Sequence, residues 1–482
     1  MAPTDGAAAL AAVRDFADLM LDHGRAAGGT GAALLFAGQL NPRTRRLPAG
    51  TPEDPGLLAA NREVAGCGPT CQNLLFDFGL LDVLRALTAV TGDQRYEVAR
   101  HEYLAHYLRY CRYPESGYFP WGEHVGYDLV QGRAVQGDYK GWHEVKAFRI
   151  PWEQLWAADP MATRHEIEVA LWSHICDPQT MVFNRHASMD GTPNIGLGPC
   201  SLADSAGAYI YSWSWLYRQT RDPRLLDRAR RIASLLWDSR SPETGLLPSS
   251  EDRPDEMWYG EPLSLACLLL WAADTLGLEG AVFGEQARAY LSAYEQYAWD
   301  TVGHGFFDTL NTVTGQPVIG PSAHYPDIAR PRHLAAWRRV ENSNHLAGVV
   351  TAAAIAYDST GESRWRYLFD RALGGMAVKA AIARGTPMVS GDAAGVLAGL
   401  VCVARRSHDS RYLAEAAPLV DYVLQANRAN GMFTGGGQDA AYYCNRLGAA
   451  DLAAAVLGYA LTCSGHGQWA PPLRNPYGAV PW

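Results

Sequence analysis

The sequence predicts an all-α protein folded as an α/α toroid (barrel), a ring of six to seven helical hairpins with long loops on one face. The first observation is a repeat, in which an apolar helix ends, a short polar turn reverses the chain, and an amphipathic helix begins. The second is a composition of 48% hydrophobic residues in a chain of 482, which supplies a large core. Because one hairpin cannot bury its apolar face alone, repeated hairpins stack on their neighbours. Clear copies carry the turns TGDQRY (91–96), TRDPRL (220–225), STGESRW (359–365) and SHDSRY (407–412).

The helices can be placed in order along the chain. A first helix is expected near 7–26 and a last helix near 448–463, each without a partner of its own. If these two pack together, the ring has seven hairpins; if they only cap it, six remain. The length would allow two or three average domains, but stacked hairpins form one continuous body, so a single domain over 1–482 is predicted. The complete hairpins are expected near 80–112, 150–176, 205–238, 262–299, 345–380 and 392–427.

Long segments rich in Gly, Pro, Trp, Tyr and His separate these hairpins. Unstructured connections of such length are uncommon unless they have a function. Since they alternate with helix pairs, they can all emerge on one face, where we expect the functional site. The segments are 113–149, 177–204, 239–261, 300–344 and 428–445.

Aromatic residues in these loops indicate a carbohydrate ligand. Trp121 lies in GYFPWGEH, Trp142 in GWHEV and Trp258 in EMWYGEP. Flat rings beside carboxylates, Asn and His suit a sugar, because its ring faces are apolar while its rim carries hydroxyls. We therefore predict substrate contacts for these three residues. The alternative is that the rings wedge the hairpins together.

Charge and motifs argue against several other ligands. A net charge of −9 with scattered Lys and Arg gives no basic surface for nucleic acid. No apolar run reaches the ~18 residues of a membrane span, so no membrane is expected. No cofactor and no required metal are predicted, because HExxH is absent and the pair Cys67 and Cys71 has no second pair downstream. The Gly-rich FTGGGQD (433–439) lacks the flanking features of a phosphate loop.

The first 30 residues resemble an amphipathic helix more than a signal peptide. Asp15, Asp18 and Asp22 interrupt the apolar residues, and no basic start precedes a continuous apolar run. The chain as it stands is expected to be cytoplasmic, or secreted if a signal segment has been removed.

The densest chemistry lies within residues 117–186. This stretch holds GYFPWGEH (117–124), the pair His143 and Glu144 in GWHEV, and FNRH (183–186). The layout resembles the α/α-toroid polysaccharide lyases, most closely polysaccharide lyase family 38, over roughly the first half of the chain. The resemblance implies cleavage of a uronic-acid glycan of glucuronan, alginate or pectate type by β-elimination.

Such a reaction requires a neutralised carboxylate, a base for the C5 proton and an acid for the leaving O4. By the resemblance, Asn184 with Arg185 neutralises the carboxylate, and His186 and Tyr259 are the candidates for base and acid. Arg253, six residues before Tyr259, would lower the pKa of that tyrosine. The alternatives are that Asn184 is a turn residue, that His186 is a hydrogen-bonded loop histidine and that Tyr259 packs at the start of a helix.

Further residues are expected to bind the substrate. His143 and Glu144 begin a predicted helix, so the helix dipole is an equally good reason for Glu144. Asn344 and His345 precede an apolar helix, where capping is the alternative. Positive charge for an acidic polymer is expected from Arg185, Arg253, Arg330 and Arg332. The complete predicted binding set is Glu123, His124, Trp121, Trp142, His143, Arg185, Trp258, Asn344 and His345.

Three other functions keep the same fold. A glycoside hydrolase or unsaturated-glucuronyl hydrolase would need an acid and a base carboxylate, or one carboxylate and a positioned water, across the cleft. A sugar 2-epimerase would need histidine bases. A non-enzymatic scaffold would bind partners along a concave surface, but it does not require loops rich in aromatic residues, His and Glu. Candidates for the hydrolase pair are Glu123, Asp190, Asp204 and Glu261.

Overall fold

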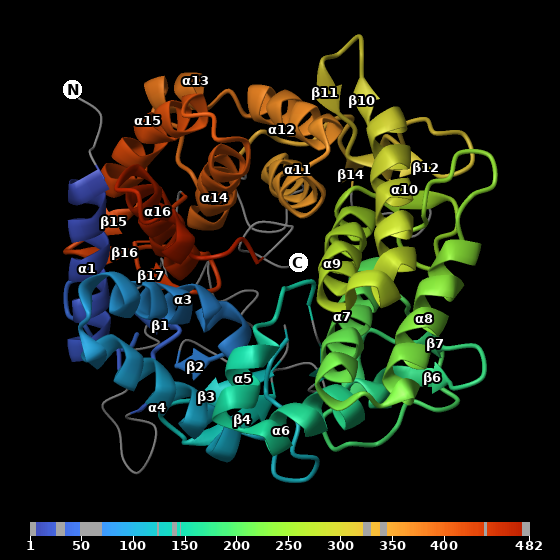
Figure 1. Cartoon of the computed structure of the whole chain (residues 1–482), viewed down its shortest axis with the longest axis horizontal. Coiled ribbons are helices and arrows are strands. Elements are labelled where there is room, and N and C mark those ends of the chain that lie inside the picture. Colours follow the sequence, from blue (N-terminus) through green and yellow to red (C-terminus); the bar gives the residue numbers. More distant parts are fainter. Residues whose placement is uncertain are drawn as a thin grey trace.

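The structure is a computed structural model that describes residues 6–25, 34–48, 70–122, 125–136, 142–144, 146–321, 329–337, 345–437 and 441–474. Figure 1 shows a ring of paired helices that runs in chain order from α1 (Gly6–His23) to α16 (Ala449–Cys463), which lies beside α1. The predicted α/α toroid is confirmed.

The helices form an inner and an outer layer (Figure 1). Inner helices are apolar on nearly all sides, and α7 buries every residue from Ala203 to Leu216. Outer helices bury only one stripe. The inner layer is α3 (Leu74–Thr91), α7 (Ala203–Thr220), α9 (Gly260–Leu276), α11 (Ala347–Thr360), α14 (Ser390–Ser407) and α16. The outer layer is α1, α4 (Gln94–Tyr110), α8 (Pro223–Asp238), α10 (Ala281–Tyr297), α12 (Ser363–Met376) and α15 (Arg411–Ala426), with the short α13 (Val378–Ala383) after α12.

The two terminal helices close the ring. Helix α16 packs against α1 as well as against its inner neighbours α14 and α3. The first and last helices therefore make a hairpin across the chain ends. This is the seven-hairpin form of the prediction.

The hairpin predicted at 150–176 is the irregular member of the ring. It consists of the short α5 (Trp152–Ala158) and α6 (Pro160–His165), followed by a π-helix over Glu166–Ala170 and a 3-10 turn over Trp172–His174. The predicted helix start at His143 and Glu144 is wrong, because His143 ends the strand β5 (Trp142–His143) and the helix begins at Trp152.

The repeated polar turns are helix caps. Asp93 and Asp222 accept hydrogen bonds from the backbone N–H of Arg95 and Arg224, which begins the outer helix of each pair. Gly92 ends α3 with a φ of 74°, a left-handed conformation that Gly adopts without strain. These caps make the inner-to-outer turns short, so the long connections all lead from an outer helix to the next inner one.

Small antiparallel sheets pin these long connections in place. Most of their strands have only two or three residues. The pairs are β1 (Gln39–Leu40) with β17 (Tyr443–Cys444), β2 (Cys71–Gln72) with β3 (Val125–Asp128) and β4 (Arg133–Gln136), β5 with β8 (Ala187–Ser188), β6 (Ile175–Asp177) with β7 (Val182–Phe183), β9 (Glu256–Trp258) with β12 (Thr309–Asn311), β10 (Trp299–Asp300) with β11 (Gly305–Phe306), β13 (Gly320–Pro321) with β14 (Ala329–Arg330), and β15 (Arg428–Ala429) with β16 (Met432–Phe433).

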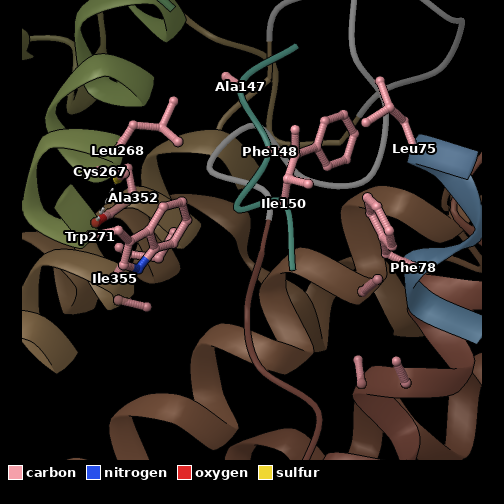
Figure 2. Close-up of a cluster of buried hydrophobic side chains, with 14 of the residues drawn as sticks. Leu75, Phe78, Ala147, Phe148, Ile150, Cys267, Leu268, Trp271, Ala352 and Ile355 are labelled. Atoms are coloured by element: carbon pink, nitrogen blue, oxygen red, sulfur yellow. Dashed lines mark hydrogen bonds between the residues drawn. The ribbon is translucent and has the colours of Figure 1, made fainter. Parts of the chain in front are cut away.

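Two segments of the polypeptide fill the middle of the ring. Figure 2 shows Ala147, Phe148 and Ile150 between α3, which carries Leu75 and Phe78, and the side chains of α9 and α11. A second segment, 470–474, also reaches the interior, where the Arg474 guanidinium binds Asp82 over 2.5 and 2.9 Å. A cavity of about 240 Å³ remains between these segments and the inner helices.

One stretch of the chain is longer and more apolar than the sequence analysis expected of any segment. Residues Gly260–Tyr297 are long and apolar enough to cross a membrane by length and composition. In the ring this stretch is two helices, α9 and α10, which pack against each other. Burial of α9 inside the ring accounts for its apolar sequence.

Candidate functional site

The long loops and the first turns of most inner helices share one face of the ring, since α3, α7, α9, α11 and α16 are each entered from a long loop. On this face, Glu144 is the centre of a polar cluster and is fully buried. Its Oε1 lies 2.9 Å from Lys146 Nζ, 3.6 Å from Arg185 Nη1 and 3.6 Å from His186 Nε2. The cluster thus joins the segment after β5 to the turn between β7 and β8.

The charges of this cluster favour an ionised Glu144. Burial alone would raise the pKa of the Glu144 carboxyl, but Lys146, Arg185 and His186 together lower that pKa below its ordinary value. Two permanent cations therefore face one carboxylate. Cations at such a site suit an anionic ligand.

Strand alternation explains which side chains enter the cluster. In β5, neighbouring side chains point to opposite faces. Trp142 stacks on the His186 ring with 5.8 Å between centroids, and Glu144, two residues on, also reaches His186. His143 points the other way, into the core, where it is fully buried. Its predicted contact with substrate is therefore replaced by contacts with buried side chains.

These buried contacts form a chain of polar groups. His143 Nε2 lies 2.5 Å from Oε1 of Glu166, and His143 Nδ1 lies 2.8 Å from Nε2 of His174. His174 Nδ1 in turn lies 2.9 Å from the carbonyl oxygen of Asn184. Burial, followed by the neighbouring His143, holds the pKa of His174 well below its ordinary value, so this ring is neutral.

The side chain of Asn184 is engaged within its own turn. Its Oδ1 accepts the backbone N–H of His186 at 3.0 Å, and its Nδ2 donates to the carbonyl of Gly198 at 3.1 Å. This is the turn role that was the alternative for Asn184. Arg185, with 26% of its side chain exposed, is the cation of this turn that can reach a ligand.

Trp258 lies between two arginines. The guanidinium carbons of Arg253 and Arg330 are 4.4 and 4.1 Å from its ring centroid. Arg253 also contacts Asp252 at 3.4 Å. Arg332 is held differently, by Asp300 at 2.9 Å. The predicted gathering of positive charge therefore includes Arg253 and Arg330 around one aromatic ring, while Arg332 is paired separately.

Tyr259 and His345 lie in the next sectors of the same face. Tyr259 directly precedes α9 and is buried, and its hydroxyl accepts the backbone N–H of His345 at 3.4 Å. Nδ1 of His345 lies 3.4 Å from Oδ1 of Asp392, in the first turn of α14. Arg253 stacks on Trp258 as described above. Asn184, His186 and Tyr259 thus belong to one loop-bearing face, in neighbouring sectors.

Two further carboxylates meet where α7 and α9 begin. The backbone N–H of Asp204 donates to Oε2 of Glu261 at 3.1 Å, and the two side chains share a hydrogen bond. Burial, then Asp204, raises the pKa of Glu261 well above its ordinary value, with Lys146 opposing the rise.

Not every predicted site residue can be assessed in this way. Trp121 is fully buried, edge-on to Phe119 and Trp152 at 5.1 and 5.7 Å, so it packs in the core and presents no face to a sugar. Within the described residues, no group of three or more His, Cys, Asp or Glu side chains is arranged to hold a metal ion. The predicted residues Glu123, His124 and Asn344, and Cys67 of the cysteine pair, lie outside the described residues.

Sequence reasoning missed Lys146, Glu166 and His174. Lys146 follows Glu144 by two residues, the spacing of side chains on one side of a strand, so strand periodicity could have found it. Glu166 and His174 were hidden because the sequence pattern there was read as a regular helix.

Residues 70–197 match the family described as periplasmic pectate lyase. No curated protein sequence matches the chain. Similar solved structures include an unsaturated glucuronyl hydrolase specific for heparin, with 11% identity, a TM-score of 0.47 and 95% of this chain and 98% of that chain covered. Others are cellobiose 2-epimerase from Spirochaeta thermophila (11%, 0.49, 95% and 96%) and the GH76A α-1,6-mannanase from Salegentibacter (10%, 0.44, 94% and 99%). The matched segment contains the Glu144 cluster, which relates this cluster to pectate lyases and indicates a carbohydrate-active enzyme.

Proposed function

We propose that this protein is a polysaccharide lyase that cleaves a uronic-acid glycan by β-elimination. Among such glycans, a pectate-type polymer is the first candidate substrate. The observation that carries the proposal is the cluster of Lys146, Arg185 and His186 around Glu144. It lies inside the segment that matches a pectate lyase family. Its cations Lys146 and Arg185 suit a substrate that carries one carboxylate on every sugar.

In the proposed reaction, Arg185 binds the carboxylate of the sugar that will lose its C5 proton. Neutralising this carboxylate makes the C5 proton more acidic, because the negative charge that develops on deprotonation spreads into the carboxyl group. Lys146 is 5% exposed and balances Glu144. Asn184 supports Arg185 indirectly by closing the turn that carries it.

A base then removes the C5 proton, the electron pair forms the C4–C5 double bond, the C4–O4 bond breaks, and an acid protonates O4. His186 is our candidate for one of these proton transfers, because 21% of its side chain is exposed beside Arg185. Tyr259, which is buried in this structure, is the candidate for the other from the sequence. Trp142, stacked on His186, supplies an aromatic surface next to the reacting sugar.

We assign Arg253, Trp258 and Arg330 to binding of neighbouring sugars along the polymer. The two guanidinium groups stacked on this ring offer positive charge for a carboxylate. Arg253 therefore binds substrate in this proposal and does not tune the pKa of Tyr259. Because the matched family is described as periplasmic, we place the proposed activity in the periplasm and not in the cytoplasm.

The hydrolase alternative is less well supported by the carboxylates on this face. Glycosidases need their two carboxyl groups about 5 to 9.5 Å apart to accommodate the sugar and, for inversion, a water. Asp204 and Glu261 share a hydrogen bond, and are too close for either geometry.

The test is incubation with polygalacturonate, alginate and glucuronan, with detection of the ultraviolet absorbance of the unsaturated uronate product. We expect absorbance to grow with the wild type and to be lost in His186→Ala and in Tyr259→Phe. Saturated reducing sugars without this absorbance would instead support the hydrolase. No product from any polyuronate would exclude both enzymes on these substrates.

A further inference from the structure

We infer that Glu166, His143 and His174 form a buried positioning chain for the turn over residues 184–186. The inference rests on the proposed lyase function, because this turn carries Arg185 and His186. The chain touches no substrate itself. It acts by fixing the backbone from which the two side chains project.

The chain ends on the backbone of the turn at two points. The carbonyl oxygen of His174 accepts the N–H of Asn184 at 2.9 Å, and Nδ1 of its ring lies 2.9 Å from the Asn184 carbonyl oxygen. Asn184 is therefore held at both of its backbone groups by one residue. The next residue, Arg185, is held through its N–H by the carbonyl of Cys200 at 2.9 Å.

The direction of the hydrogen bonds in this chain follows from the Asn184 carbonyl oxygen, which is the acceptor at the end of the chain. A carbonyl oxygen can only accept, so Nδ1 of His174 must carry the proton and donate it. Nε2 of this neutral ring then accepts from Nδ1–H of His143. The hydroxyl of Tyr209, 3.0 Å from His174 Nδ1, is the competing partner, since in the reverse arrangement it would donate to that nitrogen.

Glu166 supports this direction at the other end. With His143 donating through Nδ1, its Nε2 accepts from the indole N–H of Trp121 at 3.2 Å and from the Glu166 carboxyl at 2.5 Å, so the second proton of the pair lies on Glu166. The pair is then neutral. A neutral pair is what full burial of both side chains favours, because an uncompensated buried charge is strongly unfavourable.

The backbone around Glu166 is shaped for this contact. Glu166 opens the π-helix, and its carbonyl accepts from the N–H of Leu171, five residues on, at 3.1 Å. Single π-turns are rare and occur frequently at functional sites. The second carboxyl oxygen of Glu166 accepts the N–H of Phe119 at 3.0 Å, so the chain also ties the loop after α4 to the turn.

The first test reads the hydrogen-bond direction without any activity. In histidine-labelled protein, nitrogen NMR distinguishes the two neutral tautomers, and the signals of His174 are assigned by their loss in His174→Phe. We expect the tautomer with the proton on Nδ1, in the wild type and in Glu166→Gln. A proton on Nε2 of His174 would overturn the inference, even if no polyuronate is cleaved.

The second test compares two substitutions at one position. Glu166→Gln keeps an acceptor for Phe119 and a donor for His143 Nε2, so we expect kcat within about threefold of wild type. Glu166→Leu removes both, and we expect kcat on polygalacturonate to fall about tenfold or more, since small displacements of catalytic groups have effects of this size. Glu168→Gln, in the same π-helix but bound to the exposed Arg164, is the matched control and should leave kcat unchanged.

Equal losses in folded Glu166→Gln and Glu166→Leu would mean that the charge of Glu166 matters and not its place in the chain, which contradicts the inference. Unchanged kcat in Glu166→Leu would contradict it as well. If Glu166→Leu does not fold, the tautomer of His174 still tests the inference. If the wild type cleaves no polyuronate, the proposed function fails separately from the hydrogen-bond chain.

Discussion

Two groups of buried carboxylates in this ring respond to burial in opposite ways. Glu144 on the loop face has cations around it, and its pKa falls below the ordinary value. Asp77 in α3 and Asp451 in α16 lie where those two helices pack, and burial raises their pKa to about 6 and about 7. Burial is common to all three, so the number of nearby cations decides the outcome.

The difference separates a binding site from a structural group. The Glu144 cluster contains the cations Lys146 and Arg185 and therefore suits an anionic sugar. Between α3 and α16, Asp82 takes up the cation Arg474 in a two-pronged ion pair, and Asp77 is held by neutral donors such as Asn445 Nδ2 at 2.6 Å. We therefore expect changes at Arg185 to affect activity, and changes at Asp82 or Asp451 to affect stability.

The largest effect is expected from Arg185→Gln. Loss of the cation leaves the substrate carboxylate charged when the C5 proton is removed, so kcat/KM on polygalacturonate should fall about a thousandfold, or ~4 kcal/mol. The growth of ultraviolet absorbance measures this. Thermal unfolding should be nearly unchanged, because Lys146 still pairs with Glu144. A variant that keeps more than about a tenth of the activity would remove Arg185 from the reaction.

The next effect is on stability and concerns Asp82→Asn. This change leaves the guanidinium of Arg474 buried without its carboxylate, which costs about 3 kcal/mol in the free energy of unfolding. Denaturant titration measures the loss. In the double variant with Arg474→Gln, much of it should return, since no unpaired charge remains. Additive losses in the double variant would show that the two residues do not act as a pair.

The sequence predicted the ring because its signal is repeated. Several hairpins supply a similar apolar helix and polar turn, so an error in one copy does not hide the pattern. The sequence did not decide whether α1 and α16 pack together to close the ring, because contact between the chain ends has no local signal. The two acids Asp77 and Asp82 were visible in the apolar run LLFDFGLLDVL, but their partners Asn445 and Arg474 are more than 360 residues away in sequence.

The sequence indicated which types of residue gather at the site better than it indicated what each of them does. The turn over 184–186 and Trp142 lie together, as the spacing of their motifs suggested. His143 was expected to meet substrate, yet strand alternation turns it into the core while Glu144 faces the cluster. The π-helix that aims Glu166 has no sequence signature here, so the polar chain behind the turn could not be predicted.

A smaller effect, on stability, depends on pH and tests the comparison between the buried carboxylates. The folded protein binds a proton at Asp451 with a pKa of about 7, well above the ordinary 3.8, so between these values it holds protons that the unfolded chain releases. The contribution of this group to stability is therefore full below about pH 4 and is lost as the pH rises through about 7. Asp451→Asn should raise the unfolding free energy at pH 8 and leave it nearly unchanged at pH 4. Unfolding curves at the two pH values measure this, and an equal effect at both would assign the change to packing.

The smallest effect is expected at the edge of the binding face, where Arg330 and Arg332 offer a matched pair. Arg330 stacks on Trp258, whereas Arg332 is bound to Asp300. If the ring of Trp258 binds a neighbouring sugar, Arg330→Gln should raise KM for long polyuronates about fivefold, or ~1 kcal/mol, with little change in kcat, because the contact is remote from the bond that breaks. Arg332→Gln should leave KM within about twofold. Steady-state kinetics on polymers and on the shortest cleaved oligomer separates the two, since only the polymer reaches Trp258. A fivefold rise in both variants would instead reflect general loss of positive charge, and the positive charge of the loop face would then act as a diffuse field and not through a subsite.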